Sequence, residues 1–276
     1  MSMTRAGFAR IELSGAQAGV ELVGYPNREG PATGVLHPLQ ARALVLESSG
    51  SRIAVCVLEL CNVEQDIVAA ARERVAARGL VSADALLVTA THTHSGPRDA
   101  DPCAFPDGLD AAIEAVVAQA CERLERAVIG VGWGTLHGYA INRVRLEEPV
   151  DPALLVLRVD ATDGRPLGLV HAFGCHPVVL GPDNRLVSSD WPGWSARLLE
   201  QRLGKGAVAL FLQGASGDVN PLTDGVRARL AERHVVSSTA QLGYYGPATP
   251  PFAIGDRSGG AVAELEALGA AVADEA

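Results

Sequence analysis

The chain has 276 residues, of which 48% are hydrophobic, and a formal net charge of −9 at pH 7. This length fits one large domain or two small ones. Because the chain is acidic and its arginines are scattered, we expect no nucleic-acid partner. No stretch approaches the roughly 18 apolar residues of a membrane span, and residues 1–14 lack the apolar core of a signal peptide. We therefore expect a cytoplasmic protein without integral membrane association.

The cysteines indicate neither disulfides nor a thiolate zinc cage. The chain has five of them, and no two stand in a Cys-x-x-Cys pair. An odd count without that spacing argues against a disulfide framework. Cys56 and Cys175 lie in apolar runs and are predicted to be small core residues.

The first predicted elements are two strands, a helix and a third strand. Residues 41–47 and 53–60 are apolar runs typical of buried strands, and residues 49–51 predict a hairpin turn between them. A helical pattern covers residues 63–77, and another buried strand follows at 85–90. This order predicts a βαβ unit and hence a partly parallel sheet.

The second half of the chain continues this alternation. We predict helices over residues 108–124, 191–201 and 261–276, and strands over 128–138, 153–159, 167–173 and 208–213. Asp163-Gly164 predicts a tight turn. Asp190 is expected to cap the helix that follows it, with Pro192 in its first turn.

Residues 223–258 are rich in Gly, Pro and Ser and have weak periodicity. They predict a long surface loop with a short helix. The whole pattern predicts an α/β fold, with a mixed, partly parallel sheet and flanking helices, in a single domain over residues 1–276. No pattern indicates an oligomeric state.

Two histidines follow the strand that ends at Ala90. In extended backbone, residues i and i+2 project to the same face, so His92 and His94 are expected to converge. They would do so at the end of a parallel sheet, where ligand crevices form. For this pair alone, two polar loop histidines are an equally good interpretation.

A third histidine, His176, follows the predicted strand 167–173. Taken alone, it is better interpreted as a core histidine that donates to a backbone carbonyl. Two strand-end histidine sites together favour a shared metal, and imidazole suits zinc.

Two further segments carry polar residues after strands. The loop that follows strand 208–213 holds Asp218 and Asn220 among glycines, which let backbone approach a ligand. Its Gly-x-Ser-Gly spacing departs from a nucleophile elbow, so a serine hydrolase centred on Ser216 is a weak alternative. A plain turn is the other alternative. Arg143 could hold a carboxylate, hydroxyl or oxyanion, although such an arginine is more often a surface residue.

Four blocks in a fixed order resemble the neutral ceramidase family, the non-lysosomal zinc amidases. They are Ala90-Thr-His-Thr-His-Ser-Gly-Pro97, Ile141-Asn-Arg143, the block from His176 through Ser188-Ser-Asp190, and Gly217-Asp-Val-Asn-Pro221. An earlier Gly34-Val-Leu-His-Pro-Leu39 resembles the N-terminal block of the family. The resemblance covers approximately residues 10–221.

The resemblance implies one catalytic Zn²⁺ with His92 and His176 among its ligands. It places His94 beside the scissile carbonyl and Arg143 in contact with substrate. Asp218 and Asn220 are expected to bind substrate. The implied reaction is amide hydrolysis by a metal-activated water, with His94 carrying a proton to the leaving amine. The expected partner is a small-molecule or lipid N-acyl substrate, and the scarcity of aromatic residues favours one more soluble than ceramide.

The chain departs from the family pattern at two points. Asn220 stands where the family has a serine, which argues against a serine nucleophile. The remaining family ligands, a glutamate and a tyrosine, have no match within residues 1–276, and we expect them to lie beyond Ala276. Two alternatives stay open. One is a metal-dependent esterase or other C–N hydrolase on this scaffold, and the other is a metal- or ligand-binding domain with a decayed site.

Overall fold

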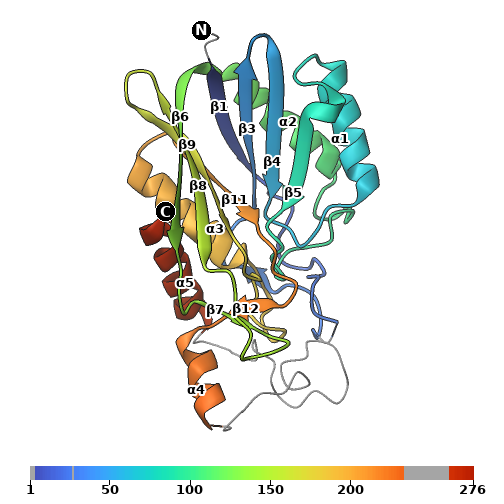
Figure 1. Cartoon of the computed structure of the whole chain (residues 1–276). Coiled ribbons are helices and arrows are strands. Elements are labelled where there is room, and N and C mark those ends of the chain that lie inside the picture. Colours follow the sequence, from blue (N-terminus) through green and yellow to red (C-terminus); the bar gives the residue numbers. More distant parts are fainter. Residues whose placement is uncertain (1–3, 27, 233–260) are drawn as a thin grey trace.

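The computed structural model describes residues 4–26, 28–232 and 261–276. Eight strands form one mixed sheet in the spatial order β11-β9-β8-β6-β1-β3-β4-β5 (Figure 1). Their bounds are β1 Arg5–Glu12, β3 Gln40–Ser48, β4 Ser51–Leu58, β5 Leu86–Ala90, β6 Glu125–Thr135, β8 Ala153–Ala161, β9 Pro166–Phe173 and β11 Val208–Gln213. The β4–β5 and β9–β11 pairs are parallel and the other neighbours antiparallel. The predicted mixed, partly parallel sheet is confirmed.

The predicted βαβ unit is present as β4, helix α1 (Gln65–Ala77) and β5. A short 3-10 helix, Ala83–Ala85, precedes β5. The hairpin before the unit pairs Ser48 with Ser51 and leaves only two residues in the turn. Ser49 and Gly50 have φ values of 53° and 80°, and two consecutive positive φ angles are what a tight hairpin requires.

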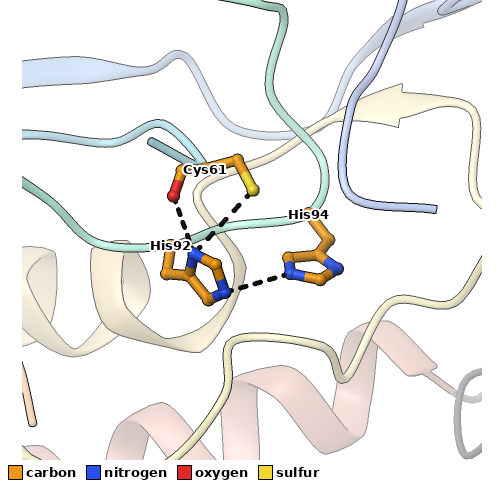
Figure 2. Close-up of side chains that lie close together, drawn as sticks. All are labelled: Cys61, His92 and His94. Atoms are coloured by element: carbon orange, nitrogen blue, oxygen red, sulfur yellow. Dashed lines mark hydrogen bonds between the residues drawn. The ribbon is translucent and has the colours of Figure 1, made fainter. Parts of the chain in front are cut away.

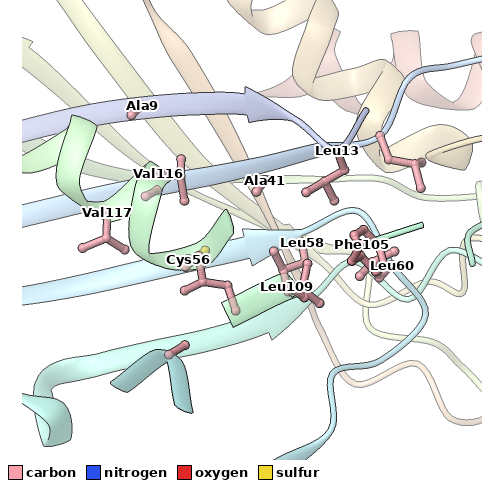
Figure 3. Close-up of a cluster of buried hydrophobic side chains, with 14 of the residues drawn as sticks. Ala9, Leu13, Ala41, Cys56, Leu58, Leu60, Phe105, Leu109, Val116 and Val117 are labelled. Atoms are coloured by element: carbon pink, nitrogen blue, oxygen red, sulfur yellow. The ribbon is translucent and has the colours of Figure 1, made fainter. Parts of the chain in front are cut away.

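The main core clusters form three layers, two between helices and sheet and one between the two halves of the sheet. The first layer lies under α2 (Leu109–Glu122), where Val116 and Val117 face strand residues such as Ala41 and Cys56 (Figure 3). The second joins Phe8 and Leu44 of one half of the sheet to Val170 and Leu210 of the other half. A third cluster lies under helices α3 (Asp190–Leu203) and α5 (Ala261–Glu275), around Phe173, Trp191 and Phe211. The two halves of the sheet therefore pack on each other, with helices outside both.

Two small ribbons join loops that are far apart in sequence. Strand β2 (Gly34–Val35) pairs in parallel with β10 (Leu186–Val187). Strand β7 (Ala140–Asn142) pairs antiparallel with β12 (Val219–Pro221). The sequence predicts only loop for residues 219–221, and that prediction is wrong because these residues pair with β7. The ribbons gather the loops at one end of the large sheet, where β5 and β9 also end (Figure 1).

Several boundaries differ from the sequence prediction. Strand β6 starts and ends three residues before the predicted strand 128–138, and β1 was not predicted. Helix α4 (Asp224–Glu232) supplies a short helix within residues 223–258. The rest of the predicted loop, from 233 on, lies outside the described residues. Among the described residues, no helix combines the length and apolar character needed to cross a membrane.

The predicted helix cap at Asp190 is wrong. Ser189 holds the cap position of α3, without a side-chain cap hydrogen bond. The Asp190 carboxylate is buried and accepts hydrogen bonds from the backbone N–H groups of Leu180 (3.0 Å), Val179 (3.4 Å) and Trp191 (2.8 Å). Asp190 thus ties the loop after His176 to the start of α3. Burial raises the pKa of its carboxyl to about 6.

Candidate metal centre

His92 is the first of the candidate metal ligands along the chain, and it lies two residues after the end of β5. Its φ is 72°, so the backbone is left-handed there, and the expected extended i, i+2 arrangement with His94 is wrong. The backbone N–H of His92 donates to the Leu60 carbonyl (2.9 Å), and its ring Nδ1 lies 2.7 Å from the Cys61 carbonyl oxygen (Figure 2). A carbonyl oxygen only accepts, so Nδ1 carries the proton and Nε2 presents a lone pair.

His176 is held in the same way from the other half of the sheet. Its backbone N–H donates to the Val219 carbonyl (3.0 Å), and its Nδ1–H donates to the Ser216 carbonyl (2.5 Å). Burial and the neighbouring Arg143 and His92 lower its pKa to about 4. His176 is therefore neutral near pH 7, and the lone pair on its Nε2 points toward His92.

The two Nε2 atoms of His92 and His176 lie 3.2 Å apart. Two nitrogens at about 2.0–2.1 Å from a tetrahedral zinc ion would be separated by about 3.3–3.4 Å. Two lone pairs that face each other at this distance repel, and a cation between them removes the repulsion. A backbone carbonyl on the opposite ring nitrogen is also the usual support of a metal-binding histidine. His92 and His176 therefore fit a zinc ion.

His94 completes a cluster of three imidazoles. Its Nε2 lies 3.4 Å from Nε2 of His92 (Figure 2), and its ring centroid lies 5.6 Å from that of His176. Burial is the largest cause that lowers its pKa, to about 2, and the nearby His92, His176, Arg143 and Arg28 lower it further. His94 is therefore neutral at neutral pH.

The residues that pack around His94 come from segment 24–28, which the sequence analysis did not identify as part of the site. The Tyr25 ring packs edge-on against the His94 ring at 5.1 Å, and Arg28 donates to the His94 carbonyl (2.8 Å). Gly24 lies so close that a Cβ there would be 2.4 Å from Cγ of His94. Its φ of 101° also suits only glycine. The one available signal was the Gly24-Tyr25 pair, which lies before the block at residues 34–39.

Cys61 lies beside the histidines, but its thiol is not placed as a ligand. One ligand atom from each of Cys61, His92 and His94 lies within 4.8 Å of the others. However, Sγ of Cys61 approaches Nδ1 of His92 (3.8 Å), and this nitrogen already donates to the Cys61 carbonyl. Figure 2 shows both contacts on the side of the ring that faces away from His94. Burial raises the thiol pKa to about 11. Cys61 therefore acts through its carbonyl, a role that no sequence motif reveals.

The β7–β12 ribbon brings Arg143 beside Asn220. The Arg143 guanidinium donates from Nε (3.0 Å) and Nη2 (2.6 Å) to the Gly217 carbonyl. Its Nη1 lies 3.5 Å from Oδ1 of Asn220, and both side chains are buried. Arg143 is thus a buried residue, and its charge contributes to the low pKa values of His94 and His176.

Asp218 is bound to the Asn142-Arg143 segment. Its carboxylate accepts a hydrogen bond from Nδ2 of Asn142 (2.8 Å), and its carbonyl accepts one from the backbone N–H of Arg143 (2.6 Å). These bonds fix the ribbon that carries Arg143 and Asn220. Ser216, the weak nucleophile candidate, contributes its backbone carbonyl to His176. The glycine-rich loop therefore supports the histidine centre with backbone groups.

A family model described as neutral/alkaline non-lysosomal ceramidase, N-terminal, matches residues 5–104 and 104–241. Neutral ceramidase B of Dictyostelium discoideum is 26% identical over 265 residues, which cover 83% of this chain and 37% of that protein. The neutral ceramidase of Pseudomonas aeruginosa is 27% identical over 250 residues, covering 79% of this chain and 37% of that protein.

A solved structure of a neutral ceramidase has the same fold as this chain. The crystal structure of neutral ceramidase from Pseudomonas aeruginosa superposes with a TM-score of 0.79 and 20% sequence identity. The match covers 100% of this chain and 44% of that chain. This chain therefore spans less than half the length of these relatives.

Proposed function

The chain belongs to the neutral/alkaline non-lysosomal ceramidase family, and from this premise we propose that it hydrolyses an amide (N-acyl) bond at a zinc centre held by His92 and His176. The observation that carries the proposal is the 3.2 Å approach of the two Nε2 atoms, each on a ring whose Nδ1–H is bound by a backbone carbonyl. Such rings are fixed in position and in tautomer, as metal ligands need to be.

A zinc ion at this place would supply Lewis acidity, which polarises a carbonyl and makes a water nucleophilic near neutral pH. The chain's own contribution is to present two imidazoles whose Nδ1–H groups are held by backbone carbonyls. In the proposed site, Arg143 stays charged beside them and is anchored by Gly217, so it can stabilise negative charge that develops on the substrate carbonyl oxygen. Asn220 lies next to Arg143, which supports the proposal that it contacts the same substrate.

His94 is the proposed proton carrier. A His94 imidazolium would be a strong acid in this buried site, because its pKa is lowered to about 2. A proton that His94 takes from the attacking water, as negative charge develops on the substrate, would therefore pass readily to the departing amine, which is the stronger base. Gly24 and Tyr25 hold the ring in place, so proton transfer would not require a large side-chain movement.

For the substrate we propose a linear N-acyl amide. The relatives named above are neutral ceramidases, which supports an amide with an acyl chain. Phe, Tyr and Trp make up only 4% of the chain, which favours a substrate smaller or more soluble than ceramide.

The proposal is tested by assaying a panel of N-acyl amides, with esters of the same acyl chains beside them. We expect amide turnover that chelation abolishes and added zinc restores. Turnover should fall by at least a hundredfold in His92→Ala and His176→Ala. His137→Ala is the matched control, since His137 is exposed and outside the cluster, and should retain wild-type turnover. Turnover that persists after chelation and in both variants would exclude the proposal, and turnover of esters alone would favour the esterase alternative.

A further inference from the structure

We propose that Thr93 is a positioning residue, whose hydroxyl joins the two histidine-bearing loops and thereby holds His92 in its left-handed conformation. The inference rests on the proposed function in one respect only, namely that His92 and His176 share a metal ion. Its structural part concerns the loops themselves and can be tested without metal.

Thr93 has no exposed surface, and its hydroxyl has two partners. Oγ1 donates to the Ser188 carbonyl (2.8 Å) and accepts a hydrogen bond from the backbone N–H of Ser95 (3.2 Å). The backbone N–H of Ser188 in turn donates to the Ser95 carbonyl (2.8 Å). Residues 93–95 are therefore joined to Ser188 by a closed ring of hydrogen bonds, in which the Thr93 hydroxyl is the only side-chain member.

Ser188 is itself firmly held. Its Oγ lies 3.0 Å from Nδ1 of His37 and accepts a hydrogen bond from the backbone N–H of Asp190 (3.0 Å). Nearby, Nδ2 of Asn184 donates to Oγ of Ser95 (3.0 Å), which is a second bridge between the loops. Residues 184–189 lie in the connection from β9 to α3, and the same connection carries His176. Thr93 therefore fastens the loop of one proposed ligand to the loop of the other.

The fastening matters because His92 has a φ of 72°. A non-glycine residue with positive φ is strained and persists only where its surroundings hold it. Thr93 is the next residue, so its two hydrogen bonds restrain the peptide that follows the strained position. Without them, residue 92 is expected to relax toward extended backbone, which would turn its Nε2 away from His176.

The test compares three variants. Thr93→Val keeps the shape of the side chain and removes the hydroxyl, whereas Thr93→Ser keeps the hydroxyl. Thr91→Val is the matched control, because the Thr91 hydroxyl is buried two residues away and has no hydrogen-bond partner among the described residues. We measure the zinc dissociation constant by competition with a chromophoric chelator. Loss of a supporting hydrogen bond commonly weakens metal binding about 10- to 100-fold, so we expect this loss in Thr93→Val and changes below about threefold in Thr93→Ser and Thr91→Val.

Amide hydrogen exchange over residues 91–97 is measured on the same proteins without metal. We expect at least tenfold faster exchange in Thr93→Val than in Thr91→Val, whether or not the wild type binds zinc. Wild-type protein that binds no zinc would refute the proposed function, and the exchange result would still decide the role of Thr93. Exchange in Thr93→Val equal to that of Thr91→Val would overturn the inference. If Thr93→Val does not fold, Thr93→Ala removes the same hydroxyl with a smaller side chain and should speed exchange at Ser95, whose N–H donates to Thr93; unchanged exchange there would overturn the inference equally.

Discussion

Replacing Arg42 with methionine tests how the two halves of the sheet are joined. Arg42 lies on β3, its side chain is 3% exposed, and it forms ion pairs with Glu59 and Glu200, whose side chains are 1% and 6% exposed. Methionine fills similar space but removes the buried cation that Glu59 and Glu200 share, and leaves them with the more exposed Arg197 and Arg10. Removing one partner of a buried ion pair costs about 3–5 kcal/mol. In a domain of this size each kcal/mol lowers the melting temperature by about 2–4 °C, so we expect a fall of about 6–20 °C.

The assay is urea unfolding followed by circular dichroism, with a thermal melt beside it. The matched control is Arg10→Met, because Arg10 also pairs with Glu200 but its side chain is 47% exposed. Solvent screening limits such a pair to about 1 kcal/mol or less. If Arg42→Met lost no more stability than Arg10→Met, the reasoning that burial makes this network costly to break would be refuted.

Three further predictions concern the site and its pH dependence. Gly24→Ala should lower turnover at least tenfold, because the added Cβ would displace His94. Gly19→Ala is the control, since Gly19 also has a positive φ but open space around it, and its turnover should not fall. Equal losses of turnover in the two variants would refute the steric argument. Cys61→Ala should keep the zinc affinity within about threefold of the wild-type value, because the backbone carbonyl of residue 61 remains. A tenfold loss of affinity in a chelator titration would instead indicate that the thiol is a ligand. Burial lowers the pKa of His171 from 6.5 to about 3, so the unfolded chain takes up a proton that the folded chain does not. The contribution of His171 to the free energy of unfolding should therefore be fully present above pH 6.5. It should be lost as the pH drops toward 3, by up to about 1.4 kcal/mol per pH unit. His171→Phe should reduce this slope in urea titrations, and an unchanged slope would exclude His171 as its source.

The sequence was informative where local pattern decides structure. The apolar runs at β3 and β4 and the helical pattern at α1 each indicated one element, and their order predicted the parallel β4–β5 pair. The pattern fails where a distant contact decides. In β1, Gly7 interrupts the run, yet a Cβ there would lie 2.0 Å from the Ala120 carbonyl of α2. The glycine is required by helix packing, which residues near it in the sequence cannot reveal.

The same limit applies to the candidate site. The three histidines were found because strand ends predicted their convergence, although the left-handed φ of His92 shows that the expected extended geometry was the wrong reason. Strand β12 was missed because Val219–Pro221 becomes a strand only through pairing with β7. The carbonyls of Cys61 and Ser216 orient the imidazoles. Every residue has a backbone carbonyl, and the path of the folded chain decides where that carbonyl points. Residue types therefore cannot predict which carbonyls orient the imidazoles.

The most direct test of the central claim is a crystal structure of the zinc-loaded protein, with anomalous difference maps recorded on both sides of the zinc absorption edge. We predict one strong peak that lies about 2.0–2.1 Å from Nε2 of both His92 and His176, with both Nδ1–H groups still bound to their carbonyls. A peak at Cys61 Sγ, or full zinc loading with no peak between His92 and His176, would contradict it.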